Sequence, residues 1–406
     1  MSTLISVNIS NEINLRGYLA IDSIVNGRCY GGVRIYPDLP PALMTQLARV
    51  MTLKHGFVGL PLGGAKAGIV ADPEMPLESK RGLLKSFGQA LEPFLKTRSY
   101  IPSEDLGTSN DDIRFMLSSI GLEAQHRLKA RYRGLTWKTT GFYTGITVFT
   151  AAVAAARHIS LDLNRASVAI EGFGSVGTSA ARMFWERGIR VVAISTSQGA
   201  IYDEAGLDVG ELIRLRDQVG SQVVNLFDKG EKIDKSQLAE LDVDIFSPCA
   251  QSYSITSDNA SRVAARIISP GANVPVTSEA EPILFQRRIL FIPDFVANCG
   301  GVLGIFMKRT GLKEDYIRQF IEEKIGEQVN EVIEAAEREK VTPRVYAERI
   351  AEERFLKAKA SVEGRNFTAR AFNFALKLYR RGIIPHQVVT PVASRYLETK
   401  LRPINR

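Results

Sequence analysis

Residues 167–177 read SVAIEGFGSVG, and this stretch decides the fold class of the second half of the chain. A short apolar run leads into three glycines spaced G-x-G-x-x-G, and a helical pattern of small and apolar residues follows. Glycines at this spacing permit a tight turn, the approach of a pyrophosphate to the backbone, and close packing of helix on strand. The helix N-terminus adds free N–H groups that favour phosphate. The motif predicts dinucleotide binding at Gly172, Gly174, Ser175, Val176 and Gly177.

Four further apolar runs of strand length follow the motif. They read RVVAIS, VDIFSP, ARIISPG and RILFIPD and begin at residues 190, 243, 265 and 288. They lack the alternation of a half-exposed strand, and helix-like stretches separate several of them. This pattern indicates a parallel sheet covered on both faces. We therefore expect an α/β protein with a doubly wound nucleotide domain.

The ends of these strands supply candidates for cofactor contact. The second strand ends in Ser195-Thr196-Ser197, where an NAD site usually has an acidic residue for the ribose 2′-hydroxyl. Hydroxyl groups do not repel a 2′-phosphate, so the sequence favours NADP or the use of both cofactors. Later strand ends add Cys249, Ala250, Asn273 and Asn298. The asparagines suit ribose or carboxamide contacts, although capping of loops explains either one alone equally well.

The first half of the chain carries a lysine in apolar surroundings. Residues 57–70 read FVGLPLGGAKAGIV, in which Lys66 is the only charged side chain. Desolvation lowers the pKa of a lysine, which suits it to acid–base or carbonyl chemistry near neutral pH. The alternative is a surface lysine on a Gly-rich turn.

Lys54 and Asp105 are less distinctive. Lys54 extends the apolar stripe of a helix that begins near Pro41, and the alternative to a functional role is that it snorkels to water. Asp105 lies in IPSEDLGTSNDD, where a turn or a helix cap is the ordinary role of an aspartate.

Composition excludes several classes of protein. The 406 residues allow two domains, and 45% apolar and 24% charged residues are ordinary for a soluble globular chain. We find no apolar run near the length of a membrane span. The cysteines Cys29, Cys249 and Cys299 lack CxxC or His spacing, which argues against a metal site and fits a reducing cytoplasm. The net charge of +8 is spread among acidic residues, so we expect no nucleic-acid partner.

Together these segments resemble the glutamate/leucine/phenylalanine/valine dehydrogenase superfamily, in collinear order over most of the chain. The motifs are GGVRIYPD (31–38), MTLKHGFVGLPLGGAKAGI (51–69), EDLGT (104–108), YTGITV (143–148), GFGSVG, SPCA, PGAN, IPDFVANCGGV and RNFTARAFNFALKLYRRG (365–382). The resemblance implies NAD(P)-dependent, reversible oxidative deamination of an L-amino acid to its 2-oxo acid and ammonia. It also implies a homo-oligomer, although the segment before RGYLAIDS is short for the hexamers and octamers of relatives.

The resemblance also divides the chain and assigns roles. We expect a substrate-binding and oligomerisation domain over residues 1–140 with a returning C-terminal helix in 365–406, a Rossmann nucleotide domain over 141–364, and an active site between them. The implied roles are α-carboxylate binding for Lys54, contact with the 2-oxo group or attacking water for Lys66, proton transfer for Asp105, and cofactor contact for Thr144. Such chemistry needs a cation, a polarising group and an acid–base.

Two positions depart from glutamate-specific members. These members carry Lys before Gly31-Gly32, where this chain has Tyr30, and Ser seven residues after Asn298, where it has Ile305. A γ-carboxylate entering this pocket would be desolvated without a partner, so we expect an apolar or aromatic amino acid to bind near Tyr30, Gly31, Gly32 and Ile305.

Two alternatives remain. Arg28 or Arg34 could supply the missing charge, which would make the protein a glutamate dehydrogenase. The chain could also be a catalytically silent regulatory or assembly homologue, but the presence of Lys54, Lys66 and Asp105 argues against that role.

Overall fold

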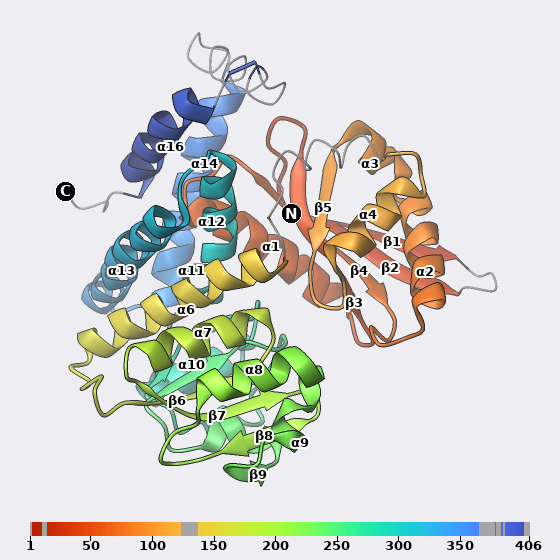
Figure 1. The fold of residues 1–406 in the computed structure, drawn as a ribbon. Coiled ribbons are helices and arrows are strands. Elements are labelled where there is room, and N and C mark those ends of the chain that lie inside the picture. The colour runs from red at the N-terminus through yellow and green to blue at the C-terminus, as the bar shows by residue number, and fades with distance from the viewer. Residues whose placement is uncertain are drawn as a thin grey trace. The chain divides into compact units, whose positions relative to one another are not determined.

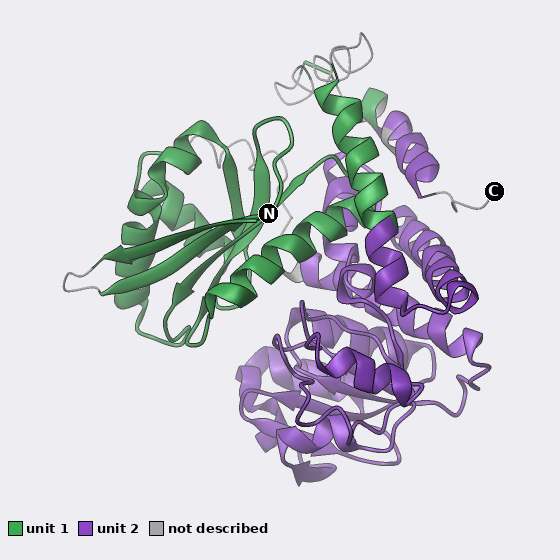
Figure 2. Cartoon of the chain, turned by 180° about the vertical axis from the view of Figure 1, so that it is seen from behind, with its two compact units in different colours: residues 1–137, 350–389 green, residues 138–349, 390–406 purple. Residues whose placement is uncertain are grey.

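The computed structural model describes residues 2–9, 14–122, 137–364, 378, 383–384 and 386–401 (Figure 1). The chain forms two compact units: unit 1 comprises residues 1–137 and 350–389, and unit 2 comprises residues 138–349 and 390–406 (Figure 2). Both units are α/β, as the sequence predicts. Of the predicted returning segment, residues 365–406, the structure describes residues 378, 383–384 and 386–401, and from residue 390 onward the segment belongs to unit 2.

Unit 1 contains a five-stranded mixed sheet in the order β1-β2-β4-β3-β5. The strands are β1 (Thr3–Ile9), β2 (Leu15–Ile21), β3 (Cys29–Tyr36), β4 (Gly63–Val70) and β5 (Tyr100–Glu104). β2 is antiparallel to β1 and β4, whereas β3 is parallel to β4 and β5. The accompanying helices are α1 (Pro41–Phe57), α2 (Leu77–Ala90), α3 (Glu92–Thr97) and α4 (Asn110–Ser118).

The two faces of this sheet are covered by different helices. Alternate strand residues such as Val33, Ala65 and Ala67 join a buried cluster with Phe87 of α2 and Met116 of α4. The opposite face of β4 is covered by α1. Because side chains alternate along a strand, the residues between those cluster members face α1.

Unit 2 contains a seven-stranded sheet in the order β12-β11-β10-β6-β7-β8-β9. The strands are β6 (Ser167–Glu171), β7 (Arg190–Thr196), β8 (Gly199–Tyr202), β9 (Glu231–Ile233), β10 (Ile245–Pro248), β11 (Ile267–Ile268) and β12 (Leu290–Phe291). The five strands from β12 to β7 are parallel and correspond to the five predicted runs. β8 and β9 extend the sheet in antiparallel fashion and were not predicted. The strand order reverses between β6 and β10, where such sheets bind ligands.

Helices complete unit 2. They are α6 (Trp137–His158), α7 (Ser175–Glu186), α8 (Val209–Val219), α9 (Val223–Leu226), α10 (Ala280–Gln286), α11 (Asp294–Ala297), α12 (Gly300–Arg309), α13 (Glu314–Glu339), α14 (Pro343–Glu363) and α16 (His386–Lys400), with short 3₁₀ helices at Gly220–Gln222 and Lys235–Glu240. α14 contributes its first turns to unit 2 and its remaining turns to unit 1.

The sequence showed no apolar run near the length of a membrane span, but one helix has that length and composition. Residues Thr139–His158 of α6 are long and apolar enough to cross a membrane by length and composition. Their apolar window is 78% buried inside the protein, which is typical of a core helix.

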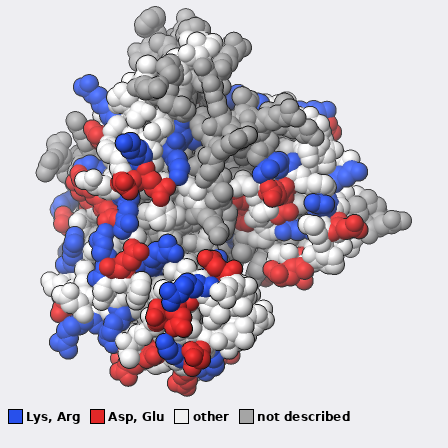
Figure 3. Space-filling view, in the orientation of Figure 1, with Lys and Arg blue, Asp and Glu red and all other residues white. Residues whose placement is uncertain are grey.

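On the face drawn in Figure 3, acidic and basic side chains intermix, in agreement with their mixing along the sequence.

Candidate active site

Lys66 lies in the middle of β4 on the face that α1 covers. An added Cβ at Gly64 would fall 2.4 Å from the backbone nitrogen of Thr52, and one at Gly68 would fall 3.0 Å from Sδ of Met44. These glycines therefore let α1 lie directly on β4, and Lys66 between them is only 2% exposed. The alternative of a surface lysine on a turn is wrong.

Asp105 follows β5 and forms an ion pair with Lys66. Its Oδ2 lies 2.8 Å from Nζ of Lys66 and accepts a hydrogen bond of 2.8 Å from Nε of Arg34. The hydroxyl of Thr108 accepts from the Asp105 backbone N–H and donates to the carbonyl oxygen of Val33, which fixes the loop. The side chain of Asp105, which is 15% exposed, therefore joins Lys66 and Arg34 in a largely buried charged cluster and does not cap a helix.

The cap of the next helix is a separate residue. Ser109 and Asp112 form a capping box at the start of α4, so this helix does not need the side chain of Asp105. The capping role that the sequence suggested for Asp105 is filled four residues later, whereas the suggested turn is present, since the N–H of Thr108 donates to the carbonyl oxygen of Asp105.

Gly32 makes room for the charged cluster, and Gly31 lets β3 lie close to β4. A Cβ at Gly32 would lie 2.7 Å from the Cβ of Asp105, and one at Gly31 would lie 1.8 Å from the carbonyl oxygen of Ala65. Neither position can hold a larger residue without displacing the backbone. Alternation along β3 places Tyr30 on the same face of the sheet as Gly32, and Tyr30 is partly exposed. Contact of these three residues with substrate stays a prediction.

The charges in the cluster shift both pKa values. Burial raises the pKa of the Asp105 carboxyl, but Arg34 and Lys66 outweigh burial and hold this pKa below its ordinary value. Burial also lowers the pKa of Lys66, Asp105 opposes that shift, and Arg34 adds to it. Asp105 is therefore a carboxylate at neutral pH, and Lys66 is the group that releases a proton more readily than an exposed lysine.

Sequence reasoning missed Arg34 as part of this cluster. The resemblance pointed to Lys54 and Lys66, but the cation that adds to the lowering of the Lys66 pKa is Arg34. The sequence contained a signal for this role: Arg34 lies in an apolar strand between Val33 and Ile35, both of which are fully buried. An arginine at such a position requires a buried partner.

Lys54 is buried in the last turn of α1, with 6% of its surface exposed, so the alternative of snorkelling to water is wrong. The neighbouring His55 is also buried, and burial together with the charge of Lys54 lowers the pKa of His55 to about 3. His55 is therefore neutral, and it leaves Lys54 as the charged group of this turn. The binding of a substrate carboxylate by Lys54 stays a prediction.

The three glycines of the nucleotide motif differ in their surroundings. Gly172 has φ +90°, and a Cβ there would lie 2.8 Å from the Cβ of Ala250. A Cβ at Gly177 would lie 1.8 Å from the carbonyl oxygen of Gly172, whereas a Cβ at Gly174 would meet nothing within 4 Å. Packing inside the protein thus requires the first and third glycines, and the second borders open space where a pyrophosphate is expected.

The helix behind this turn is available to an anion. α7 begins at Ser175, and its N-cap Gly174 provides no side-chain hydrogen bond. The first N–H groups of α7, which include Val176, therefore lack a side-chain cap, and such groups favour phosphate. These features fit a dinucleotide, although contact of the predicted residues with one stays a prediction.

The hydroxyls at the end of β7 hold backbone atoms. Ser195 Oγ accepts a hydrogen bond of 3.0 Å from the N–H of Gly172. Thr196 Oγ1 donates to the carbonyl oxygen of Ser221 at 2.7 Å. Lys235 donates to the carbonyl oxygen of Ser197 at 3.3 Å, which brings a cation to this strand end that the sequence did not reveal.

The end of β6 carries a carboxyl group beside the first glycine. Burial raises the pKa of Glu171, and the hydroxyl of Ser254 donates to its Oε2 at 2.6 Å. The N–H of Cys249 donates to the carbonyl oxygen of Glu171, and burial raises the pKa of the Cys249 thiol to about 12. Cys249 is therefore an uncharged thiol that helps to join β10 to β6.

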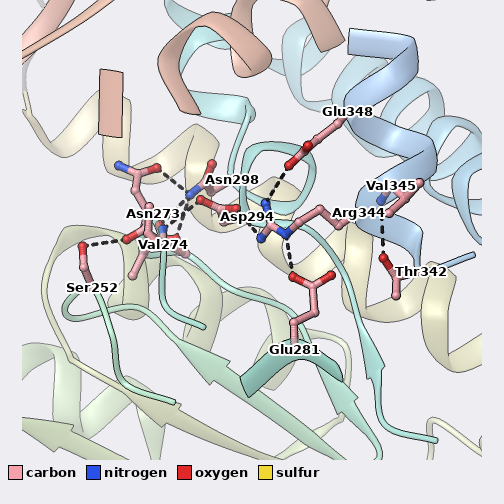
Figure 4. A network of polar contacts seen from close by, with 12 residues as sticks. Ser252, Asn273, Val274, Glu281, Asp294, Asn298, Thr342, Arg344, Val345 and Glu348 are labelled. Atoms are coloured by element: carbon pink, nitrogen blue, oxygen red, sulfur yellow. Dashed lines mark hydrogen bonds and ion pairs between the residues drawn. The ribbon is translucent and has the colours of Figure 1, made fainter. Parts of the chain in front are cut away.

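Asn273 and Asn298 lie together at the carboxyl end of β11 (Figure 4). Nδ2 of Asn298 donates to the carbonyl oxygens of Gly271 and Ala272 and to Oδ1 of Asn273, at 3.0–3.2 Å. The hydroxyl of Ser252 donates to the carbonyl oxygen of Asn273. Asn298 thus braces the loop, as the capping alternative predicted, and cofactor contact for either asparagine stays a prediction.

Thr144 and Ile305 lie on two helices of unit 2 that pack closely. The hydroxyl of Thr144 donates to the carbonyl oxygen of Thr140 within α6. A Cβ at Gly304 of α12 would lie 2.3 Å from Cγ of Tyr143, so Gly304 is a packing position. Ile305, the next residue, is partly exposed and is the side chain that this turn can offer to a ligand.

Comparisons with known proteins bear on this geometry. The model of the Glutamate/Leucine/Phenylalanine/Valine dehydrogenase family matches residues 138–362, and that of the Glu/Leu/Phe/Val dehydrogenase dimerisation domain matches residues 3–121. The NAD-specific glutamate dehydrogenase of Staphylococcus aureus is 34% identical over 326 residues, which cover 79% of this chain and 78% of that protein. The glutamate dehydrogenase of Thermotoga maritima is 33% identical over 344 residues, which cover 82% of each.

Solved structures similar to this chain are also amino-acid dehydrogenases. The hetero-hexameric glutamate dehydrogenase from Thermus thermophilus, in a leucine-bound form, is 25% identical with a TM-score of 0.73 and covers 88% of each chain. The L-tryptophan dehydrogenase from Nostoc punctiforme is 25% identical with a TM-score of 0.58, and the match covers 88% of this chain and 96% of that one.

Proposed function

This chain belongs to the glutamate/leucine/phenylalanine/valine dehydrogenase family, and on that premise we propose that it catalyses NAD(P)-dependent, reversible oxidative deamination of an L-amino acid. The observation that carries the proposal is the buried charged cluster of Lys66, Asp105 and Arg34. Two cations and one carboxylate leave a surplus positive charge in a site with little water. Such a site stabilises an oxyanion that develops in the transition state.

A nicotinamide dinucleotide, when bound, accepts the hydride from the substrate Cα. The chain must then bind the α-carboxylate, which is the proposed task of Lys54, and polarise the 2-oxo group or the attacking water, which is the task of Lys66. Asp105 is a weak base while both cations hold it. Movement of Lys66 toward the substrate removes one of those cations, raises the pKa of Asp105 and lets it accept a proton.

For the substrate we propose an apolar or aromatic L-amino acid. Arg34, a possible replacement for the missing lysine, is 6% exposed and is bonded to Asp105, so it is not available to a γ-carboxylate. Tyr30 lies on the face of Lys66 and Ile305 is partly exposed. Burial of a branched or aromatic side chain contributes about 1.5–3 kcal/mol, whereas a carboxylate would lose its hydration unless Arg28, which is partly exposed, pairs with it.

Glutamate is the second candidate. It is supported by the names of the relatives in Staphylococcus aureus and Thermotoga maritima, at 34% and 33% identity. A screen of the twenty amino acids with both cofactors decides between the candidates through kcat/KM for glutamate, leucine, valine, phenylalanine and tryptophan. A preference for glutamate would overturn the substrate proposal and leave the chemistry intact. A protein silent with every amino acid, under conditions in which it binds cofactor, would favour the regulatory homologue.

We propose that both NAD and NADP are used. No carboxylate stands at Ser195-Thr196-Ser197, and Lys235 donates to the carbonyl oxygen of Ser197 at the same strand end. A cation near that position favours a 2′-phosphate, whereas the named relative in Staphylococcus aureus is NAD-specific. For assembly we propose a homo-oligomer, supported by the match to a dimerisation domain, and light scattering of the purified protein tests it.

A further inference from the structure

Arg344, near the start of α14, is surrounded by carboxylates (Figure 4). Its guanidinium lies 2.6 Å from Glu281, 3.0 Å from Asp294 and 3.5 Å from Glu348, measured between nitrogen and oxygen. It also lies 5.5 Å from the ring centre of Phe291. Asp294 is completely buried, and Arg344 is its ion-pair partner among the described residues. A buried carboxylate of this kind depends on that guanidinium.

The second oxygen of Asp294 holds a strained turn. Oδ2 accepts a hydrogen bond of 2.8 Å from the N–H of Val274. Val274 has φ +52°, a left-handed conformation that is a true outlier for a β-branched residue. Such strain persists only where the surrounding structure enforces it, and it is concentrated at functional sites. The ion pair of Asp294 with Arg344 therefore helps to maintain a backbone conformation that valine does not favour.

The strained turn adjoins a predicted cofactor residue. Asn273 directly precedes Val274, and its side-chain oxygen accepts from Asn298 at 3.0 Å. The carbonyl oxygen of Val274 accepts from the N–H of Tyr253, and that of Asn273 accepts from Ser252. The position of Asn273 is thus fixed by its neighbours on both sides, and the left-handed turn sets the direction of the chain that carries it.

We propose that Arg344 is a positioning residue: through Asp294 it holds the left-handed turn at Val274 and so orients Asn273 toward the nicotinamide half of the cofactor. The proposal rests on the function proposed above, because it takes Asn273 to face the cofactor. Arg344 touches no reacting atom; it acts through Asp294. No sequence motif led to this pair, since its members lie 50 residues apart.

The test compares ligands that contain or lack nicotinamide. In Arg344→Gln, the dissociation constants of NAD and NADP, measured by calorimetric titration without substrate, are expected to rise about tenfold, because a hydrogen bond between Asn273 and the cofactor is lost. The dissociation constant of ADP, which lacks both the nicotinamide and its ribose, is expected to stay at its wild-type value. Equal weakening of all three ligands would mean a general structural defect and would overturn the proposal.

Two further variants connect the effect to strain. Glycine adopts φ +52° without penalty, so adding Val274→Gly to Arg344→Gln is expected to restore most of the NAD affinity. Failure to restore it would break the link between Arg344 and the turn. Arg344→Lys keeps the buried charge and is expected to fold even if Arg344→Gln does not. It should weaken NAD binding selectively, but to a smaller extent than Arg344→Gln. Wild-type NAD affinity in this variant would count against the proposal.

A matched control separates this proposal from the one on which it rests. Arg349 lies on the same helix, is exposed and pairs with Glu339. Arg349→Gln is expected to leave the affinities for NAD, NADP and ADP unchanged. A wild-type protein that binds none of these ligands would overturn the proposed function itself. A wild-type protein that binds NAD, with Arg344→Gln no different, would overturn only the positioning role.

Discussion

The two glycine-rich segments GGAKAG (63–68) and GFGSVG (172–177) look alike in sequence and differ in structure. In the first, a Cβ added at Gly63, Gly64 or Gly68 would meet protein atoms at 2.4, 2.3 and 2.9 Å. In the second, a Cβ at Gly174 would meet nothing within 4 Å. The glycines of the first segment are needed because α1 and neighbouring loop residues occupy the space. One glycine of the second borders space that the protein leaves open.

This difference separates two ways of building a site. The first segment uses glycines to bury one charged side chain, Lys66, and the chemistry resides in that side chain. The second segment carries no charged side chain in its turn and offers backbone N–H groups at the start of α7. Substitutions should therefore have different consequences at the two kinds of position: loss of catalysis or of fold in the first segment, and loss of ligand binding at Gly174 in the second.

The largest effect is expected for Asp105→Asn. This change leaves Arg34 and Lys66 buried without an anion, and breaking a buried ion pair in this way costs about 3–5 kcal/mol of folding free energy. Chemical denaturation of the variant and the wild type measures the difference. An unchanged free energy of unfolding would show that the cluster is better solvated than its burial indicates.

The pH dependence of the same variant has a defined sign. The folded-state pKa of Asp105 lies below its ordinary value of 3.8, so its stabilising contribution is complete above that value and is lost as pH falls through the folded pKa. The stability gap between wild type and Asp105→Asn is therefore expected to shrink in acid below pH 3.8, where Asp105 takes up a proton. A gap that shrinks already between pH 7 and pH 5 would contradict a depressed pKa.

Lys66→Ala is expected to abolish turnover with little loss of stability. Removal of one stabilising group from such a site costs about 10²–10³ in rate, and more if the group also activates water. The fold should survive because Arg34 still pairs with Asp105. Steady-state deamination, thermal melting and cofactor titration measure the three properties. Near-wild-type turnover would falsify the active-site assignment.

Gly64→Ala and Gly174→Ala compare the two segments directly. The first substitution places a methyl group 2.3–2.4 Å from Thr52 and is expected to destabilise the fold by about 1–3 kcal/mol through overpacking. The second should leave the melting temperature near the wild-type value and weaken NAD binding, because the methyl group occupies the open side of the turn. The reverse pattern, with Gly174→Ala unfolding the protein, would remove the distinction between the segments.

Thr196→Asp gives the smallest expected effect. A carboxylate at this strand end repels a 2′-phosphate and should shift the ratio of kcat/KM toward NAD by about tenfold, or roughly 1.4 kcal/mol. The loss of the Thr196 hydrogen bond to Ser221 is the confounding change, and Thr196→Val controls for it. If the wild type already prefers NAD by more than about tenfold, the proposal that both cofactors are used is wrong.

Local patterns in the sequence predicted most of unit 2. The five parallel strands could be recognised because each is a short apolar run. The nucleotide turn could be recognised because its three glycines lie within six residues of one another. The short strands β8 and β9 escaped notice because Gly199–Tyr202 and Glu231–Ile233 carry no pattern of their own. They exist through pairing with β7 and with each other.

Pairing over long distances in sequence was not predictable in the same way. Lys66 stood out because its immediate neighbours in the sequence are apolar. Its ion-pair partner is Asp105, which also binds Arg34, and Arg34 lies 71 residues before Asp105. The same is true of Arg344 and Asp294. A sequence shows which side chain will be difficult to bury; the fold decides which opposite charge makes burial possible.

The helix α14 has a consequence for how the protein melts. Its first turns, with Arg344, belong to unit 2, and its later turns belong to unit 1, where Arg354 donates to the carbonyl oxygen of Phe57 at 2.9 Å. A helical fragment of two turns is not stable alone in water. Unfolding of either unit would therefore fray the helix that the other one needs. We expect the two units to unfold in one cooperative transition, and a calorimetric trace with a single peak would record that coupling.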